Sequence, residues 1–305
     1  MRTAQCGIFA LGTGSHAYLE LDAREGQAPR LVSAIASLRE PRTTMGGVNL
    51  VVGFRPELWR TVDPEDAPPR VHGFEADIGG VEGFVMPATQ CDAVLWLSGA
   101  SYDVVFDVAR KAIATLKDVA RVVEETSSWP YHHDRDLTGF IDGTENPSLI
   151  DAPGVALIPA GSAGEAGTVL LLQKWVHDVA AWELLPADSQ ERVIGRTKLD
   201  SIELEHKPSD SHVARTDQDL FGKVFRRNMP YGTATNHGTV FVGFSAEQQA
   251  LQKMLESMCG LATGARDALT RYMRPLTGAY YFVPSIERLR QTSGGLAPSS
   301  SPPPR

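Results

Sequence analysis

The order of the segments with regular hydrophobic spacing constrains this chain most strongly. In the first half of the sequence, alternating or continuous apolar runs predict four strands, and apolar residues three or four positions apart predict two helices. The expected strands cover residues 16–22, 48–54, 93–97 and 119–124, and the expected helices cover 30–40 and 103–117. The resulting order, strand-helix-strand-strand-helix-strand, is that of a ferredoxin-like α+β unit.

The second half of the sequence repeats this order loosely. Strands are expected at 168–176, 238–244 and 278–283, and helices at 179–185 and 246–258. Between the halves, the segment 146–167 contains three prolines and several glycines, which is the composition of a linker. The sequence therefore predicts an α+β fold of two ferredoxin-like domains, similar to a dimeric α+β barrel, at residues 1–147 and 148–290. The Ser/Pro-rich tail at 291–305 is expected to be disordered.

Charge and hydropathy argue against two broad classes of partner. The formal net charge is −8, whereas a general nucleic-acid-binding protein needs a basic face to bind phosphates. No apolar run approaches the ~20 residues of a membrane span, and the N-terminal residues lack a secretory or twin-arginine signal. We therefore expect a cytoplasmic protein with no nucleic-acid or membrane partner. Cys6, Cys91 and Cys259 are widely spaced, which suits isolated reduced thiols.

Two short patterns resemble ligand-binding motifs, but their contexts do not fit. Residues 12–17 match the dinucleotide pattern G-x-G-x-x-A, yet strand-like alternation follows where a helix would have to begin. An NAD-dependent oxidoreductase is therefore only a weaker alternative. His132 and His133 are adjacent, so on an extended chain they point to opposite faces, and Arg135 adds a positive charge. Residues 132–136 are better interpreted as a solvated loop than as a metal site.

Residues 139–147, Gly-Phe-Ile-Asp-Gly-Thr-Glu-Asn-Pro, form the most specific pattern in the chain. An aromatic-aliphatic pair precedes Asp142 and Gly143, and Asn-Pro follows, which predicts a strand end entering a constrained turn. On spacing alone an ordinary turn is the better interpretation, although an acid at this position can also face a cavity. The whole string resembles the signature of the dye-decolourising peroxidases (DyP family). In these haem enzymes the acid lies above the haem iron.

The resemblance continues in two later segments. His212 stands in the sequence Ser-His-Val-Ala-Arg at 211–215, and in the family a histidine in such a setting is the axial haem ligand. A family arginine precedes a Pro-Tyr-Gly turn by four positions. Here the turn is at 230–232, so the matching residue is Arg226, with its neighbour Arg227 as the alternative.

Three further residues match positions that lie near the haem in the family. Asn228 fills the place of a distal asparagine in the bacterial B-type members. Arg196 lies in a segment resembling the haem edge, where it could pair with a propionate, and a turn with solvated charges is an equal alternative. Asp267 is a candidate partner for the ring N–H of His212, with a helix N-terminal acid as the alternative. The resemblance implies catalytic roles for Asp142, Arg226 and Asn228, and cofactor-binding roles for His212, Thr144, Glu145, Arg196, Arg226 and Asp267, with His212 as the metal ligand.

The resemblance implies a haem b peroxidase of the B-type subgroup, which reduces H2O2 to water while oxidising dyes, phenols or other one-electron donors. The absence of a Cys-x-x-Cys-His motif predicts non-covalent haem. Because fold does not fix function, a non-catalytic haem-binding or haem-handling protein is the alternative. The resemblance also implies a homo-oligomer. Some relatives associate with an encapsulin shell, but the end of this chain lacks an apolar docking peptide.

Overall fold

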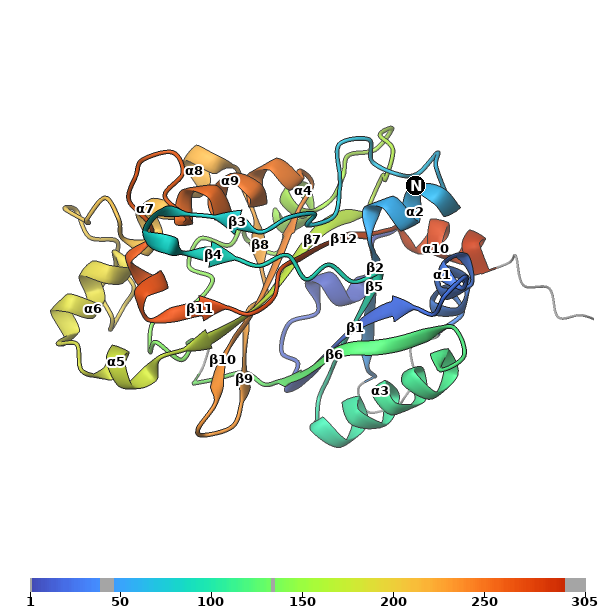
Figure 1. Cartoon of the computed structure of the whole chain (residues 1–305), viewed down its shortest axis with the longest axis horizontal. Helices are drawn as coiled ribbons and strands as arrows, with labels where there is room; N and C mark the ends of the chain where they lie inside the picture. The colour runs from blue at the N-terminus through green and yellow to red at the C-terminus, as the bar shows by residue number, and fades with distance from the viewer. Residues whose placement is uncertain (1, 39–46, 133–134, 294–305) are drawn as a thin grey trace, which may run out of the picture.

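The fold is built around an antiparallel sheet with helices on its outside (Figure 1). The computed structural model describes residues 2–38, 47–132 and 135–293. Its strands are β1 (Ser15–Ala23), β2 (Asn49–Phe54), β3 (Ile78–Gly79), β4 (Val85–Met86), β5 (Ala93–Gly99), β6 (Ala120–Ser128), β7 (Thr168–His177), β8 (Phe225–Arg226), β9 (Met229–Gly232), β10 (His237–Ser245), β11 (Met273–Pro275) and β12 (Ala279–Val283). Its α-helices are α1 (Ala28–Ala36), α2 (Pro56–Val62), α3 (Tyr102–Leu116), α4 (Ala152–Ala156), α5 (Val179–Glu183), α6 (Ala187–Ile194), α7 (His212–Arg215), α8 (Gln218–Phe221), α9 (Gln248–Met258) and α10 (Ile286–Ser293). Short 3-10 helices cover Cys6–Phe9, Val81–Gly83 and Ala268–Arg271.

Eight of the strands close into a ring. β10 pairs with both β9 and β7, which closes the order β7-β12-β2-β5-β1-β6-β9-β10, and β8 and β11 extend the sheet beside β10 and β7. Each half of the chain contributes four strands, and the halves meet where β12 pairs with β2 and β6 pairs with β9. The predicted α+β fold with two ferredoxin-like halves in a barrel-like sheet is therefore confirmed. Because the sheet runs continuously through both halves, the domain division after residue 147 stays a prediction.

Strand β5 illustrates why the sheet closes. All seven of its residues are buried. Val94 and Trp96 belong to the barrel interior together with Tyr281, whereas Leu95 and Leu97 belong to the outer core that α1 and α3 cover. Successive strand residues point to opposite faces, so an apolar run like this needs cover on both sides. A closed barrel with helices outside provides that cover.

The ends of two predicted segments differ from expectation. The helix expected at 30–40 is α1, which ends at Ala36, and its last two expected residues lie outside the described part of the chain. The tail was expected to be disordered from residue 291. Residues 291–293 instead complete α10, because the helix continues to Ser293 and packs against α1. Residues 294–305 lie outside the described residues.

The segment between the halves is more than a connecting linker. Ala152 and Ala156 of α4 are fully buried in the barrel core, and the backbone N–H of Ala246 donates to the carbonyl of Val155. Apolar side chains at helical spacing thus fix this Pro/Gly-rich segment against β8 and β10. Within the described ranges, no helix is long and apolar enough to cross a bilayer.

Candidate active site

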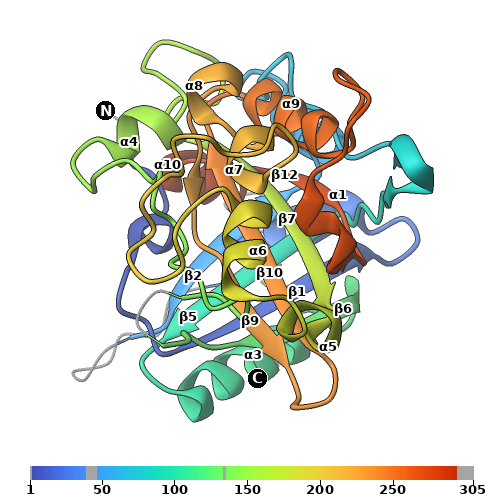
Figure 2. The ribbon, with the colours of Figure 1, turned by 90° about the vertical axis from the view of Figure 1, so that its left-hand side faces the viewer.

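A cavity lies where α7 and α9 cover one face of β7 and β10, on the side of the molecule that Figure 2 presents. It contains about 1140 Å³ of empty space, including the part that is open to solvent. Its walls are largely apolar, and such a lining is typical of sites that hold a cofactor. The apolar wall includes Leu171, Trp175, Ile194, Val213, Phe241, Leu251, Met254, Leu255, Met258 and Leu269.

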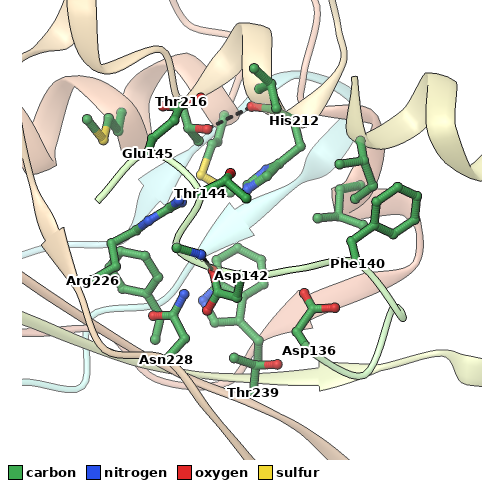
Figure 3. Close-up of a pocket in the computed structure, with 18 of the residues that line it drawn as sticks. Asp136, Phe140, Asp142, Thr144, Glu145, His212, Thr216, Arg226, Asn228 and Thr239 are labelled. Carbon is green, nitrogen blue, oxygen red and sulfur yellow. Dashed lines mark hydrogen bonds between the residues drawn. The ribbon is translucent and has the colours of Figure 1, made fainter. Parts of the chain in front are cut away.

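The cavity brings together most of the residues that the sequence singled out. These lining residues are Asp142, Thr144, Glu145, Arg196, His212, Arg226 and Asn228. In Figure 3 the ring of His212 enters from the upper part of the view, with Arg226 on the left and Asp142 and Asn228 below. Asp267 does not line the cavity but contacts His212 from behind.

His212, the first residue of α7, is held by a buried carboxylate. Its Nδ1 lies 2.7 Å from Oδ2 of Asp267, which is fully buried and accepts a second hydrogen bond from the backbone N–H of Leu269. The carboxylate can only accept, so Nδ1 carries the proton and the lone pair of Nε2 is available to a metal. Burial alone would lower the pKa of His212, but the charge and hydrogen bond of Asp267 outweigh it and raise that pKa.

Asp142 lies in a tight turn at the cavity wall. Its Oδ1 accepts a hydrogen bond of 2.7 Å from the backbone N–H of Gly143. Gly143 has a φ of +72°, a left-handed conformation that favours glycine. This conformation explains why a glycine follows Asp142. The strand-like lead-in is a single bridge between Ile141 and Arg135, whose guanidinium also donates to the carbonyl of Gly139. No described residue donates a hydrogen bond to the second carboxylate oxygen of Asp142, and the residue lines the cavity.

The two adjacent arginines lie in different surroundings. Arg226 lines the cavity, and its Nε is buried without a hydrogen-bond partner from the described residues. The side chain of Arg227 instead donates to the carbonyls of Ile8 and Ala10 and stacks on Trp96 in the barrel. Successive residues of an extended chain point to opposite sides, which separates the two guanidiniums.

Polar side chains at the cavity edge hold one another in place. Arg196 donates to Glu145 at 2.8 Å and to Glu203 at 3.3 Å, and its Nη1 donates to the carbonyl of Ser201. Asn228 accepts from the backbone N–H of Val242. Arg196 is therefore a partly buried cation between two carboxylates rather than a freely solvated charge.

Asp136 is a cavity residue that the sequence did not single out. It was assigned to a solvated loop, and this was wrong: the side chain is half-buried in the cavity wall and accepts from the backbone N–H and hydroxyl of Thr138. Burial, together with the negative charge of Asp142, raises the pKa of Asp136 to about 6. Its only mark in the sequence is an Asp-x-Thr turn pattern, which is common in loops. Of the neighbouring histidine pair, His133 lies outside the described residues.

Known proteins with similar sequences share this architecture. The model of the family described as Dyp-type peroxidase, C-terminal, matches residues 133–288. The dye-decolorizing peroxidase of Mycobacterium tuberculosis is 36% identical over 274 residues, which cover 85% of this chain and 78% of that protein. The solved structure of a dye-decolorizing protein from V. cholerae is 33% identical with a TM-score of 0.87, and the match covers 94% and 99% of the two chains. The chain belongs to the DyP-type peroxidase family.

As a member of this family the protein is a peroxidase, an oxidoreductase. A Rhodococcus jostii RHA1 DypB variant solved in complex with haem is 31% identical, with a TM-score of 0.87 and coverage of 96% and 100%. This supports haem as the cofactor of the DyP-type fold. The residues present fit such a group, because an apolar wall, the available Nε2 of His212 and the Nε of Arg226, which no described residue pairs, all adjoin one cavity.

Proposed function

We propose that this DyP-type peroxidase binds haem b without a covalent link, reduces H2O2 to two water molecules and oxidises dyes, phenols or other one-electron donors. The donor supplies two electrons and two protons for each peroxide. The observation that carries the proposal is the meeting of His212, Asp142 and Arg226 at one apolar cavity (Figure 3). A metal ligand, a proton-transfer residue and a fixed positive charge are what peroxide cleavage requires.

His212 is proposed as the residue that would hold the haem iron. Asp267 keeps the imidazole proton on Nδ1, leaves Nε2 to bind the iron, and gives the ring anionic character. When bound, the haem would supply a redox-active iron that can store the oxidising equivalents of peroxide. Arg196, together with Thr144 and Glu145, lies where it can hold the haem edge, and its guanidinium suits a carboxylate such as a propionate.

Asp142 and Arg226 are proposed to divide the work on peroxide. The carboxylate of Asp142 accepts the proton from one peroxide oxygen and delivers it to the other, which leaves as water. The guanidinium of Arg226 stays charged and stabilises negative charge on the peroxide before the proton is delivered. Asn228 lies beside them and adds an amide that can orient the peroxide.

The proposal is tested with haem-loaded protein mixed rapidly with H2O2, followed by visible absorption and by steady oxidation of a dye. Wild type should react and turn over, Asp142→Ala and Arg226→Leu should react slowly, and His212→Ala should lose the spectrum of a histidine-ligated haem. The rival is a haem-binding protein without peroxidase activity. It predicts a normal haem spectrum with no peroxide-dependent dye oxidation at any pH from acidic to neutral.

Two further predictions concern the setting of the protein. We expect a homo-oligomer in the cytoplasm. Sedimentation of the purified protein and fractionation of the source cells test the two expectations separately.

A further inference from the structure

The side chain of Asn146 is tied to the backbone of Arg226, 80 positions later in the sequence. Its Nδ2 donates to the carbonyl of Arg226 at 2.9 Å, and its Oδ1 accepts from the backbone N–H of Arg226 at 2.8 Å. The backbone partners fix the orientation of the amide, since an N–H can only donate and a carbonyl can only accept. No acidic or apolar side chain of this size satisfies both groups at neutral pH.

The position of Arg226 in the sheet explains why this contact is available. β8 is the last strand on its side of the sheet and pairs with β10 on one edge only, where Arg226 is opposite Gly243. The next residue, Arg227, donates its N–H to Val242 of β10. The N–H and carbonyl of Arg226 therefore point to the free edge of β8, where the amide of Asn146 takes the place of a neighbouring strand.

The same asparagine fixes the turn that carries Asp142. The backbone N–H of Asn146 donates to the carbonyl of Gly143 at 2.9 Å, which closes the turn immediately after the acid. The side-chain amide also packs against this turn, since a Cβ at Gly143 would lie 2.9 Å from its Nδ2. One residue thus contacts both the turn of the acid and the backbone of the arginine.

We propose that Asn146 is a positioning residue that holds Asp142 and Arg226 in one register, so that acid and guanidinium act on the same peroxide. The inference rests on the proposed roles of these two side chains. A misplacement of about 1 Å between groups that act together can slow a reaction by roughly 100-fold. The contact is therefore expected to affect the reaction with peroxide far more than the binding of haem.

The test compares Asn146→Ala and Asn146→Asp with wild type, all loaded with haem. Asn49→Ala is the matched control, because Asn49 is also half-buried and donates one hydrogen bond, on β2 away from the cavity. Two quantities are measured: the second-order rate with H2O2, and the dissociation constant of fluoride from the resting protein. Fluoride reports the donor groups above the iron without turnover.

Asn146→Ala should react with peroxide roughly 10- to 100-fold more slowly and bind fluoride several-fold more weakly, at normal haem content. Asn146→Asp should behave like Asn146→Ala at neutral pH and recover toward wild type as the pH falls, because a protonated carboxyl both donates and accepts. This pH-dependent recovery separates positioning from a general loss of stability, which would not improve in acid.

A rate and a fluoride affinity of Asn146→Ala within twofold of wild type would overturn the inference. If Asn146→Ala does not fold or load haem, a constant ratio of Asn146→Asp to wild-type rate across pH overturns it instead. Failure of the proposed function looks different: Asp142→Ala and Arg226→Leu would then react as fast as wild type, whatever the asparagine variants do.

Discussion

The imidazole of His212 and the carboxylate of Asp267 share a hydrogen bond of 2.7 Å across 55 positions of sequence. The acid is fully buried and the histidine faces the cavity, so the pair connects the protein interior to the site proposed for iron. A ligating histidine with such a partner is more electron-donating than a neutral one. Asp267 is therefore expected to have an electronic effect on the bound iron in addition to orienting the ring.

Replacing Asp267 with asparagine should raise the reduction potential of the bound iron and slow the reaction with peroxide by roughly 10- to 100-fold. The amide keeps an acceptor for Nδ1–H but removes the negative charge. Spectroelectrochemical titration of the haem-loaded variant measures the potential. Thr270→Val is the control, since that hydroxyl donates only to the backbone carbonyl of Asp267. Equal shifts in both variants would contradict the electronic role.

Arg226→Leu should mainly change the rate of the reaction with peroxide, whereas Arg227→Leu should mainly change stability. Removing the cavity guanidinium should slow the reaction with peroxide by about 10² to 10³ with little loss of stability, because its proposed role is to stabilise developing charge. Removing Arg227 leaves the carbonyls of Ile8 and Ala10 unpaired, so it should lower the free energy of unfolding by about 1–3 kcal/mol. Stopped-flow kinetics and urea unfolding separate the effects. A slow reaction confined to Arg227→Leu would reverse the assignment.

Asp136→Asn should stabilise the haem-free protein at neutral pH and have little effect in acid. The pKa of Asp136 is raised from 3.8 to about 6, so the folded protein binds more protons than the unfolded chain between these values. Below the pKa of the unfolded chain, this carboxyl makes its whole contribution to the free energy of unfolding. That contribution is lost as the pH rises through the pKa of the folded protein. The expected gain is about 1–3 kcal/mol, measured by urea unfolding at acidic and neutral pH.

The control for this prediction is Asp118→Asn, which removes a carboxylate from an exposed position after α3. It should change stability by the same small amount at both pH values. An Asp136→Asn variant whose stability relative to wild type does not depend on pH would show that Asp136 titrates normally in the folded protein.

Arg196→Ala should weaken the retention of haem. A hydrogen bond to a charged group contributes about 1.5–3 kcal/mol, so loss of one propionate contact should speed haem release roughly tenfold or more. Transfer of haem to an excess of apomyoglobin measures the rate. Glu203→Gln is the control, because Glu203 contacts Arg196 without lining the cavity. Unchanged release from Arg196→Ala would contradict a contact between Arg196 and the haem.

The sequence predicted the long elements and the specific motifs, and it failed where tertiary contacts determine the outcome. The pattern is clear in β1 and α3 because both elements are long: α3 buries one face over several turns, and the first seven residues of β1 are buried in succession. The short β8 and β9 were missed, since two to four residues are too few to establish an alternating pattern. The choice between Arg226 and Arg227 depends on the direction of one strand residue, which no spacing records.

The same limit applies to the residues that surround the site. The string at 139–147 drew attention to Asp142. Asn146 belongs to the same string, but its hydrogen-bond partner, Arg226, lies 80 positions later in the sequence. Asp136 has an ordinary turn pattern, and only folding places it next to the charge of Asp142. Motif resemblance thus indicated the proposed site residues, while the contacts that orient their side chains and shift their pKa values required the structure.

The central claim is that this chain is a haem peroxidase in which His212 holds the iron. The most direct test is the visible spectrum of the haem-loaded protein before and after H2O2, recorded for wild type and His212→Ala in the presence of a dye. The account predicts a rapid spectral change and dye oxidation in wild type, and loss of both in the variant. A stable haem spectrum in wild type with no peroxide-dependent dye oxidation, or an unchanged spectrum in His212→Ala, would contradict it.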